Sequence, residues 1–248
     1  MNKINLPVIK SKSRYKLILP FDQFLNKAKI LKESLSYVRE LKVYFPEFNL
    51  ENGDTVIDVG AHIGSFSVPI AALNEEVKVY CFEPNKRNYE ILRRNRDINK
   101  LHGQMDINNK AVLHEDGKVV FKRGGTSTTG VVLGINPHVI NNGGIKELLA
   151  DVESPEDAVN CISLERIFSQ NKIHVCKLVK MDCEGSEYKI FESVDGKILG
   201  QIEYIIVEAH PTEKNKPEDL RLSLLAHGFE VMSISCHNGC YVFYCKRN

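Results

Sequence analysis

The stretch Ile57-Asp-Val-Gly-Ala-His-Ile-Gly64 decides how this chain can fold. It overlaps the short apolar run 55–59, which predicts a strand, and precedes residues 65–73, which have the pattern of a helix. Gly60 permits a tight turn and has no Cβ that would clash with a ligand. Gly64 lets the helix start close to the strand, and the helix N-terminus offers free N–H groups to ligand oxygens. The stretch therefore predicts a ligand-binding turn between a strand and a helix.

Strand-like and helix-like segments alternate after this turn. Strands are predicted at 77–82, 105–112, 176–181 and 202–207, and helices at 85–99, within 186–199 and at 217–226. Such alternation predicts a parallel sheet covered by helices on both faces. Near the C-terminus, β-rich runs at 229–235 and 241–246 flank Asn238-Gly239, which is a strong hairpin signal. We expect an α/β fold with a mostly parallel seven-stranded sheet that ends in an antiparallel hairpin.

Two regions do not fit this alternation. Residues 1–50 are predicted to form a helical extension, because apolar residues recur at helical spacing from Phe21 to about Tyr44. Residues 51–248 form the main domain, with a glycine-rich insertion near 113–160. This insertion is either an ordinary surface segment or a mobile loop that covers a site, and the sequence leaves both interpretations open.

The composition excludes some classes of protein and partner. A net charge of +1 gives no general attraction to nucleic acid or to anionic membranes. The seven cysteines are scattered, without a Cys-x-x-Cys pair, which favours a reducing cytoplasm over a disulfide framework. Cys236, His237 and Cys240 lack a partner pair at zinc-site spacing, so we do not expect them to bind metal. No signal peptide and no membrane span is expected. We expect a cytoplasmic protein, and the oligomeric state is not predicted.

An acidic residue supports a nucleoside ligand at the turn. Glu83 ends the second predicted strand, about 20 residues after the glycines, where a carboxylate can accept hydrogen bonds from both ribose hydroxyls. The alternative is a surface residue that caps a helix before Pro84. His62 occupies the position of the middle glycine in the dinucleotide fingerprint, where a bulky side chain disfavours a pyrophosphate. It is compatible with the compact methionine tail of S-adenosylmethionine, whose ammonium group Asp58 could help to position.

A second group of polar residues follows two neighbouring strands. Lys180-Met-Asp-Cys-Glu-Gly-Ser-Glu187 lies at the end of the strand 176–181, and Glu208-Ala-His210 ends the strand 202–207. Ligands of open α/β sheets bind at this edge. The alternative is that Asp182 and Glu184 cap the next helix, with Glu187 in its first turn.

These motifs together resemble the series found in FkbM-type methyltransferases. The resemblance rests on 57–64, Cys81-Phe-Glu-Pro84, 95–99, 180–187 and Val207-Glu-Ala-His210, and covers roughly 54–210. It implies a Rossmann-like methyltransferase fold with S-adenosylmethionine as cofactor. It also implies O-methylation of a hydroxyl on a sugar, polyketide or similar small metabolite. The partner expected is therefore a small-molecule or glycan acceptor.

The resemblance also implies roles for individual residues. Gly60, Ala61, Gly64 and Glu83 would hold the cofactor, Ala111 and Val112 at the end of the third strand would flank the adenine, and Asp182 would lie near the methyl donor. We add Asp58, His62 and Pro84 to the predicted cofactor-binding residues. His62 departs from the asparagine that is common at this point of the family. Residues 1–50 and 113–160 have no recognised counterpart, and we expect them to determine the choice of substrate.

The acceptor hydroxyl must lose its proton during such a reaction. We predict His210 as the general base, because an unperturbed imidazole titrates near neutrality, with Lys180 or Asp182 as the alternative base. A divalent metal held by Asp182, Glu184 and His210 could instead lower the pKa of the hydroxyl, but no spacing rule demands it, and the sequence favours a metal-free site. Two rival functions are an NAD-dependent oxidoreductase and a non-catalytic nucleoside-binding module of the same fold.

Overall fold

The computed structural model describes residues 44, 50–73, 75–123, 130–133, 158–237 and 240–248. The predicted N-terminal helix therefore lies outside the described residues, except for Tyr44. Much of the insertion and the Asn238-Gly239 turn also lie outside them.

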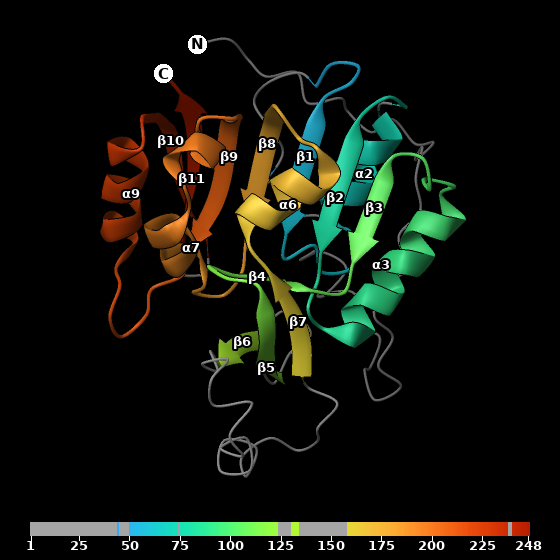
Figure 1. Cartoon of the computed structure of the whole chain (residues 1–248), viewed down its shortest axis with the longest axis horizontal. Helices are drawn as coiled ribbons and strands as arrows, with labels where there is room; N and C mark the ends of the chain where they lie inside the picture. The colour runs from blue at the N-terminus through green and yellow to red at the C-terminus, as the bar shows by residue number, and fades with distance from the viewer. Residues whose placement is uncertain (1–43, 45–49, 74, 124–129, 134–157, 238–239) are drawn as a thin grey trace.

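The main sheet has seven strands in the order β10-β11-β9-β8-β1-β2-β3 (Figure 1). The strands are β1 (Thr55–Val59), β2 (Lys78–Phe82), β3 (Met105–Asn108), β8 (Cys176–Met181), β9 (Ile202–Ala209), β10 (Phe229–His237) and β11 (Cys240–Arg247). β1 pairs in parallel with β2 and β8, β2 with β3, and β8 with β9. β11 runs antiparallel to both β9 and β10. The predicted α/β sheet with a reversed C-terminal hairpin is confirmed.

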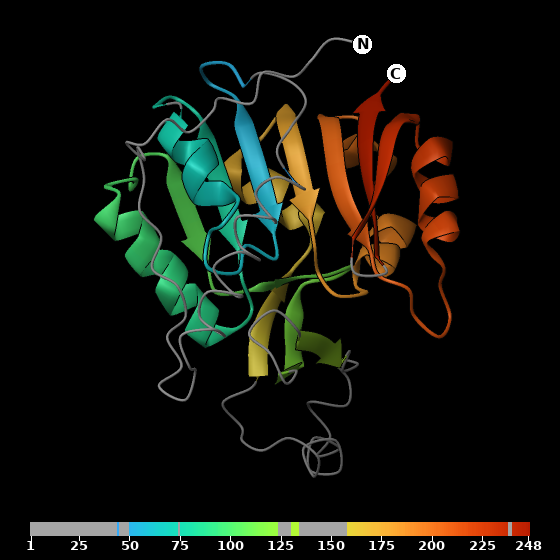
Figure 2. The ribbon, with the colours of Figure 1, turned by 180° about the vertical axis from the view of Figure 1, so that it is seen from behind.

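Helices cover both faces of this sheet because apolar residues point to both sides of its strands. On one face, α2 (Ser67–Leu73) and α3 (Lys86–Ile98) pack against a cluster that includes Val56 of β1. On the other face, α6 (Leu164–Asn171), α7 (Glu187–Ser193), α8 (Gly196–Leu199) and α9 (Pro217–Ala226) contribute to a cluster that includes Ile57. Figure 1 shows α6 and α7 in front of the sheet, and Figure 2 shows α2 in front from the opposite side.

The expectation of a single third strand at 105–112 was wrong. β3 ends at Asn108, and Ala111–Val112 forms β4 of a second sheet. This four-stranded sheet has the order β4-β7-β5-β6 and includes β5 (Gly117–Arg123), β6 (Gly130–Leu133) and β7 (Ala158–Ile162). β4 pairs with β7, a partner far along the chain that local patterns do not reveal. The insertion thus contributes strands, and its sheet lies at the end of the main sheet toward which the parallel strands point (Figure 1).

The helix predicted within 186–199 is two short helices. Val194 leaves the helical conformation, and Asp195 starts α8 by accepting a hydrogen bond from the N–H of Lys197 at 2.8 Å. All seven cysteines are free thiols, as expected from their scatter, and Cys81, Cys161, Cys176 and Cys245 are buried. Within the described part of the chain, no helix combines the length and the apolar character that a membrane span requires.

Candidate active site

The turn after β1 needs its two glycines for packing. Gly60 and Gly64 have positive φ angles of +74° and +88°, a backbone region that other residues rarely adopt. A Cβ on Gly60 would lie 1.8 Å from the backbone oxygen of Asp182, and one on Gly64 would lie 2.8 Å from side-chain carbons of Leu92 and Val68. Gly60 therefore lets the turn contact the end of β8, and Gly64 lets it contact α3.

Four N–H groups of the turn itself are bonded within the protein, and the expected free N–H groups at the start of the helix stay a prediction. The N–H groups of Gly60 and Ala61 both donate to the carbonyl oxygen of Phe82 at 3.0 Å. The N–H of His62 donates to Glu83 Oε2 at 2.8 Å, and that of Gly64 donates to the carbonyl of Ala61. The end of β2 accepts three of these four bonds, because β1 and β2 end side by side.

His62 has a φ of +51°, in the left-handed region where asparagine and histidine are enriched among non-glycine residues. This backbone requirement explains how a histidine can stand where the family commonly has asparagine. The turn is further fixed by Asn95, a fully buried residue of α3 whose amide donates to the carbonyl of Ile63 at 2.8 Å.

Glu83 lies at the end of β2 and is 5% exposed. Its Oε2 accepts the bond from His62, and its Oε1 accepts from the N–H of Asn85 at 2.9 Å and from the side chain of Asn88 at 3.5 Å. Burial raises the pKa of Glu83 to about 7, although these bonds and the charge of Lys180 lower it. The helix cap after Pro84 is Asn85, whose side chain accepts from Arg87 and Asn88. The capping interpretation of Glu83 is therefore wrong.

Lys180 connects the turn to the strand ends. Its Nζ donates to the carbonyl of Gly60 at 3.0 Å and lies 3.4 Å from Asp58 Oδ1 and 3.8 Å from Asp182 Oδ2. Asp58 is fully buried, and its burial raises its pKa against the opposing effect of Lys180. The observed contact of Asp58 is thus with Lys180, and its role toward a cofactor stays a prediction.

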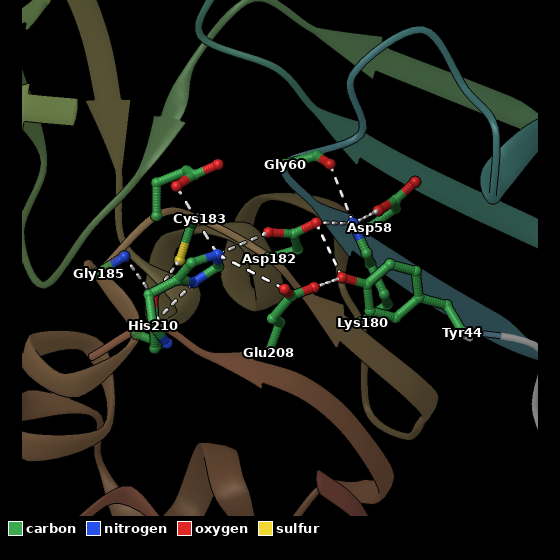
Figure 3. A network of polar contacts seen from close by, with 11 residues as sticks. Tyr44, Asp58, Gly60, Lys180, Asp182, Cys183, Gly185, Glu208 and His210 are labelled. Carbon is green, nitrogen blue, oxygen red and sulfur yellow. Dashed lines mark hydrogen bonds and ion pairs between the residues drawn. The ribbon is translucent and has the colours of Figure 1, made fainter. Parts of the chain in front are cut away.

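The loop after β8 and the end of β9 meet at His210, as predicted from the sequence. The Nδ1 of His210 lies 3.1 Å from Oε1 of Glu187, a fully buried carboxylate that also accepts from the backbone N–H of His210 at 2.8 Å. The Nε2 lies 3.6 Å from Asp182, 3.7 Å from Glu184 and 3.8 Å from Glu208. Figure 3 shows this nitrogen directed toward the carboxylates.

Electrostatics at this edge follow from the crowding of acids. Burial alone would lower the pKa of His210, but the hydrogen bond to Glu187 and the charges of Glu187, Asp182 and Glu184 raise it to about 9. Burial also raises the pKa of Glu184, which the charge of His210 opposes. The acids around His210 therefore favour a positive charge at this point of the site.

Glu187 lies in the first turn of α7, as the capping alternative expected, but neither Asp182 nor Glu184 is the cap of this helix. The N-cap of α7 is Ser186, which makes no side-chain capping bond. Glu184 and Gly185 instead form a tight turn with φ angles of +55° and +101°, and Glu187 Oε2 accepts from the N–H of Gly185 at 2.9 Å. This turn directs the Glu184 side chain toward His210.

Tyr44 is a site residue that sequence reasoning missed. It is 4% exposed, and its hydroxyl donates to Asp182 Oδ2 at 3.0 Å and also bonds Glu208 Oε2. Its ring faces the Nζ of Lys180 at 4.9 Å from the centroid (Figure 3). No motif identifies it, because a tyrosine within an amphipathic pattern is typical of an ordinary packing residue. Glu208 was visible in the motif at the end of β9 but was assigned no role.

Other predicted residues lie apart from this edge. Ala111 and Val112 are buried in β4 of the second sheet rather than at the end of β3, so their predicted place in the fold was wrong. Asn109, which follows β3, donates from its side chain to the carbonyls of Glu83 and Pro84 at 2.8 and 3.0 Å. Asn109 therefore holds the start of the second sheet close to Glu83.

Comparison with known families gives a match over much of the chain. A model described as the Methyltransferase FkbM domain matches residues 58–231. This range includes the glycine turn, Glu83 and the acidic edge, by which we mean residues 180–187 and 208–210 at the ends of β8 and β9. A curated relative, the 31-O-demethyl-FK506 methyltransferase FkbM of Streptomyces tacrolimicus, is 26% identical over 200 residues, covering 74% of this chain and 75% of the relative.

Solved structures share the fold at low sequence identity. Magnesium protoporphyrin IX methyltransferase (ChlM) from Synechocystis PCC 6803 with bound SAM aligns with a TM-score of 0.51 at 12% identity, covering 92% of this chain and 87% of that one. The same enzyme with bound SAH gives a TM-score of 0.50 at 11% identity, with 92% and 90% covered. At such identities the likeness concerns the fold alone.

Proposed function

This chain belongs to the FkbM methyltransferase family, and we propose that it methylates a hydroxyl of a sugar or another small metabolite with S-adenosylmethionine as donor. The family match decides against the alternative of an NAD-dependent oxidoreductase. The observation that carries the proposal is the contact between the glycine turn and the acidic edge, where Gly60 abuts the backbone of Asp182. A nucleoside cofactor held by the turn would extend its reactive end directly toward Asp182 and His210.

The residues around the turn fit a nucleoside. The side chain of Glu83 is fixed at the end of β2 by bonds from the backbone N–H groups of His62 and Asn85. Each carboxylate oxygen can accept two hydrogen bonds. Oε2 accepts one bond from the N–H of His62, which leaves capacity for a ribose hydroxyl. The carboxylate of Glu83 would thereby bind the ribose while it also bonds His62 of the turn.

When bound, S-adenosylmethionine supplies a methyl group on a positively charged sulfur. The chain's own residues must hold the acceptor oxygen in line with that carbon and exclude competing water. Asp182 and Glu208 lie at the strand ends beside the turn, where their oxygens can accept hydrogen bonds from an acceptor hydroxyl. Lys180 fixes the distance between the glycine turn and Asp182, because its Nζ donates to the carbonyl of Gly60 and lies beside the Asp182 carboxylate.

The assignment of an oxygen acceptor is supported by the curated relative, whose name states methylation at a 31-O position. It is supported chemically by the crowding of carboxylates, which accept hydrogen bonds from hydroxyls. Removal of the hydroxyl proton by His210, Lys180 or Asp182 stays a prediction. The three carboxylates around Nε2 of His210 favour coordination of a cation over proton abstraction by this nitrogen.

The direct test is incubation of the full chain with S-adenosylmethionine and a panel of sugars, polyketides and simple alcohols. We expect one acceptor to gain 14 mass units, with formation of an equal amount of S-adenosylhomocysteine. Fragmentation of the product locates the methyl on oxygen, carbon or nitrogen. A methyl on nitrogen or carbon would overturn O-methylation, and cofactor binding without any product would favour the non-catalytic module.

A further inference from the structure

His210 and three carboxylates lie close together at the acidic edge, where β8 and β9 end. The Nε2 of His210 lies 3.6–3.8 Å from Asp182 Oδ1, Glu184 Oε2 and Glu208 Oε1. N–H···O hydrogen bonds are about 2.7–3.2 Å long, so the four atoms face one another without bonding directly. The donor atoms of Asp182, Glu184 and His210 all lie within 4.8 Å of one another.

Glu187 fixes the orientation of the His210 imidazole through the ring nitrogen opposite to Nε2. Glu187 is fully buried and lies against Nδ1 of His210 at 3.1 Å, and it accepts from the backbone N–H of the same residue. A carboxylate can only accept, so the Nδ1 carries the hydrogen and the lone pair of a neutral imidazole lies on Nε2. This arrangement is found in almost all metal-ligating histidines, whose second nitrogen donates to a carboxylate or carbonyl.

The carboxylates are oriented by a different residue. The Tyr44 hydroxyl lies between Asp182 Oδ2 and Glu208 Oε2, the two oxygens that are not directed at His210, and donates its single hydrogen to one of them at a time. The other oxygen of each carboxylate, Oδ1 and Oε1, faces Nε2. Tyr44 is itself held by burial and by the Lys180 ammonium against its ring (Figure 3). Glu187 therefore positions His210, and Tyr44 lies against the carboxylates of Asp182 and Glu208, whose other oxygens face Nε2 of His210.

The charges at this point need a cation. Three carboxylates surround one imidazole nitrogen, and like charges this close oppose each other's ionisation unless a cation lies between them. We propose that Asp182, Glu184, Glu208 and His210 bind one divalent cation of the Mg²⁺ or Mn²⁺ class. Three oxygen donors suit these hard ions, and imidazole is tolerated by Mn²⁺. The sequence favoured a metal-free site because spacing alone does not show that Glu208, Glu187 and Tyr44 join the group.

The dimensions are compatible with such an ion. With bonds of about 2.1 Å, an octahedral ion holds neighbouring ligands about 3 Å apart and opposite ligands about 4.2 Å apart. The separations from Nε2 of His210, at 3.6–3.8 Å, exceed the neighbouring value by less than about 1 Å, and the donor atoms of Asp182 and Glu184 lie within 4.8 Å of each other. The Sγ of Cys240 lies within 4.8 Å of donor atoms of Glu208 and His210, but the oxygen donors outnumber it.

A catalytic use of the ion rests on the proposed function. An acceptor hydroxyl bound to the ion would have a lowered pKa and release its proton to water. The oxygen then forms a bond to the methyl carbon while the carbon–sulfur bond breaks and its electron pair stays on sulfur. The products are a methyl ether and a neutral thioether. The ion itself is neither oxidised nor reduced.

Binding of the ion is tested without cofactor or acceptor. The full chain is stripped with a chelator, dialysed and titrated with Mn²⁺, while free Mn²⁺ is followed by electron paramagnetic resonance. We expect one ion per chain, with a ¹⁴N coupling in the pulsed spectrum that shows one imidazole ligand. Asp182→Asn and His210→Ala should each weaken binding at least tenfold, and His210→Ala should remove the ¹⁴N coupling.

Two further variants separate positioning from ligation. Glu187→Gln should lower Mn²⁺ affinity roughly 10- to 100-fold, the usual effect of removing a carboxylate behind a ligating histidine, while the ¹⁴N coupling persists in the ions still bound. Glu203→Gln is the matched control. Glu203 lies at the opposite end of β9, where it pairs with Lys177 of β8, so this substitution should leave Mn²⁺ binding unchanged. Thermal unfolding of every variant shows whether the fold is retained.

The proposal is overturned if the stripped chain binds no Mn²⁺, or if folded Asp182→Asn and His210→Ala bind it as the parent does. Binding of Zn²⁺ alone, lost in Cys240→Ser, would also show the assigned ligands to be wrong. Methyl transfer that continues unchanged in the stripped chain would overturn the catalytic use of the ion. Mn²⁺ binding at these residues without methyl transfer to any acceptor would leave the site standing and contradict the proposed function.

Discussion

At the scale of single residues, the site depends on close backbone contact at Gly60. Its φ of +74° and the position of its missing Cβ, 1.8 Å from the Asp182 carbonyl oxygen, both exclude a larger residue. The same contact places the turn beside the acidic edge, so a change here disturbs stability and the proposed cofactor site together.

Gly60→Ala should therefore lower the free energy of unfolding by about 2–4 kcal/mol, since both an unfavourable φ and a backbone collision contribute. Urea unfolding measures this change. Gly103→Ala is the control, because a Cβ there would meet nothing within 4 Å, and its effect should stay within about 0.5 kcal/mol. Equal effects of the two substitutions would show that the contact with Asp182 is not the cause.

Glu83 predicts a pH dependence of cofactor affinity. Its pKa of about 7 means that the carboxyl is mostly protonated at pH 6 and mostly ionised at pH 8. The ionised form accepts hydrogen bonds from ribose hydroxyls, so S-adenosylhomocysteine should bind up to about tenfold more tightly at pH 8 than at pH 6. Calorimetry at both values measures this ratio, and Glu83→Gln should bind more weakly with a smaller ratio.

The same shift has the opposite sign for stability. The folded pKa lies above the ordinary value of 4.5 for a glutamate, so folding favours the protonated carboxyl. This contribution is fully present below about pH 4.5 and is lost as the pH rises through about 7. The stability of a Glu83→Gln variant relative to the parent should therefore rise as the pH increases from about 4.5 to about 7, and stay level above that. A relative stability that instead fell over this range would contradict the direction of the shift.

At the scale of elements, the start of α6 joins the two sheets. Ser163 caps this helix by accepting from the N–H of Arg166 at 3.2 Å. Asp116, which directly precedes β5, accepts from the N–H of Ser163 at 2.8 Å and from its hydroxyl at 3.1 Å. The cap thus links the small sheet to a helix of the main domain.

Ser163→Ala removes both the cap and the hydroxyl bond to Asp116, and should lower the free energy of unfolding by about 1 kcal/mol. Chemical denaturation measures the loss. Ser169→Ala lies on the same helix, where the hydroxyl bonds only the carbonyl of Arg166 at an exposed position, and should change stability by less than about 0.5 kcal/mol. A Ser163 variant as stable as this control would show that the link between the sheets contributes little.

At the scale of the whole molecule, a residue from the N-terminal region completes the edge formed by β8 and β9. Tyr44 is separated from Asp182 by 138 positions and from Glu208 by 164, yet its hydroxyl lies between their carboxylates. Tyr44, which precedes the main domain in the sequence, therefore brings a hydroxyl to the edge formed by β8 and β9.

Tyr44→Phe keeps the packing of the ring and removes the hydroxyl that orients Asp182 and Glu208. We expect the turnover rate to fall about tenfold, a size typical of hydrogen bonds to charged groups, while S-adenosylhomocysteine binding stays within about twofold. Steady-state kinetics and calorimetry measure the two quantities. Tyr241→Phe, at an exposed position of β11, is the control and should change neither. Loss of cofactor affinity in Tyr44→Phe would contradict a role restricted to the acidic edge.

The sequence by itself determined the strands of the main sheet, the reversed C-terminal hairpin and the residues of the glycine turn, but it did not predict β5, β6, β7 or α6. The predicted features follow from local patterns, because apolar period, glycine and Asn-Gly turns act over a few neighbouring residues. It also determined that residues 180–187 and 208–210 meet, because the carboxyl ends of neighbouring parallel strands share one edge.

Only the tertiary structure decided which of these side chains face one another. The pairing of β4 with β7, the bond of Glu187 to His210 and the placement of Tyr44 join positions far apart in the chain. No local pattern encodes such contacts, since they depend on how packed elements orient side chains across the gap between them. For that reason the sequence named His210 as a base, whereas the structure surrounds its Nε2 with carboxylates suited to a cation.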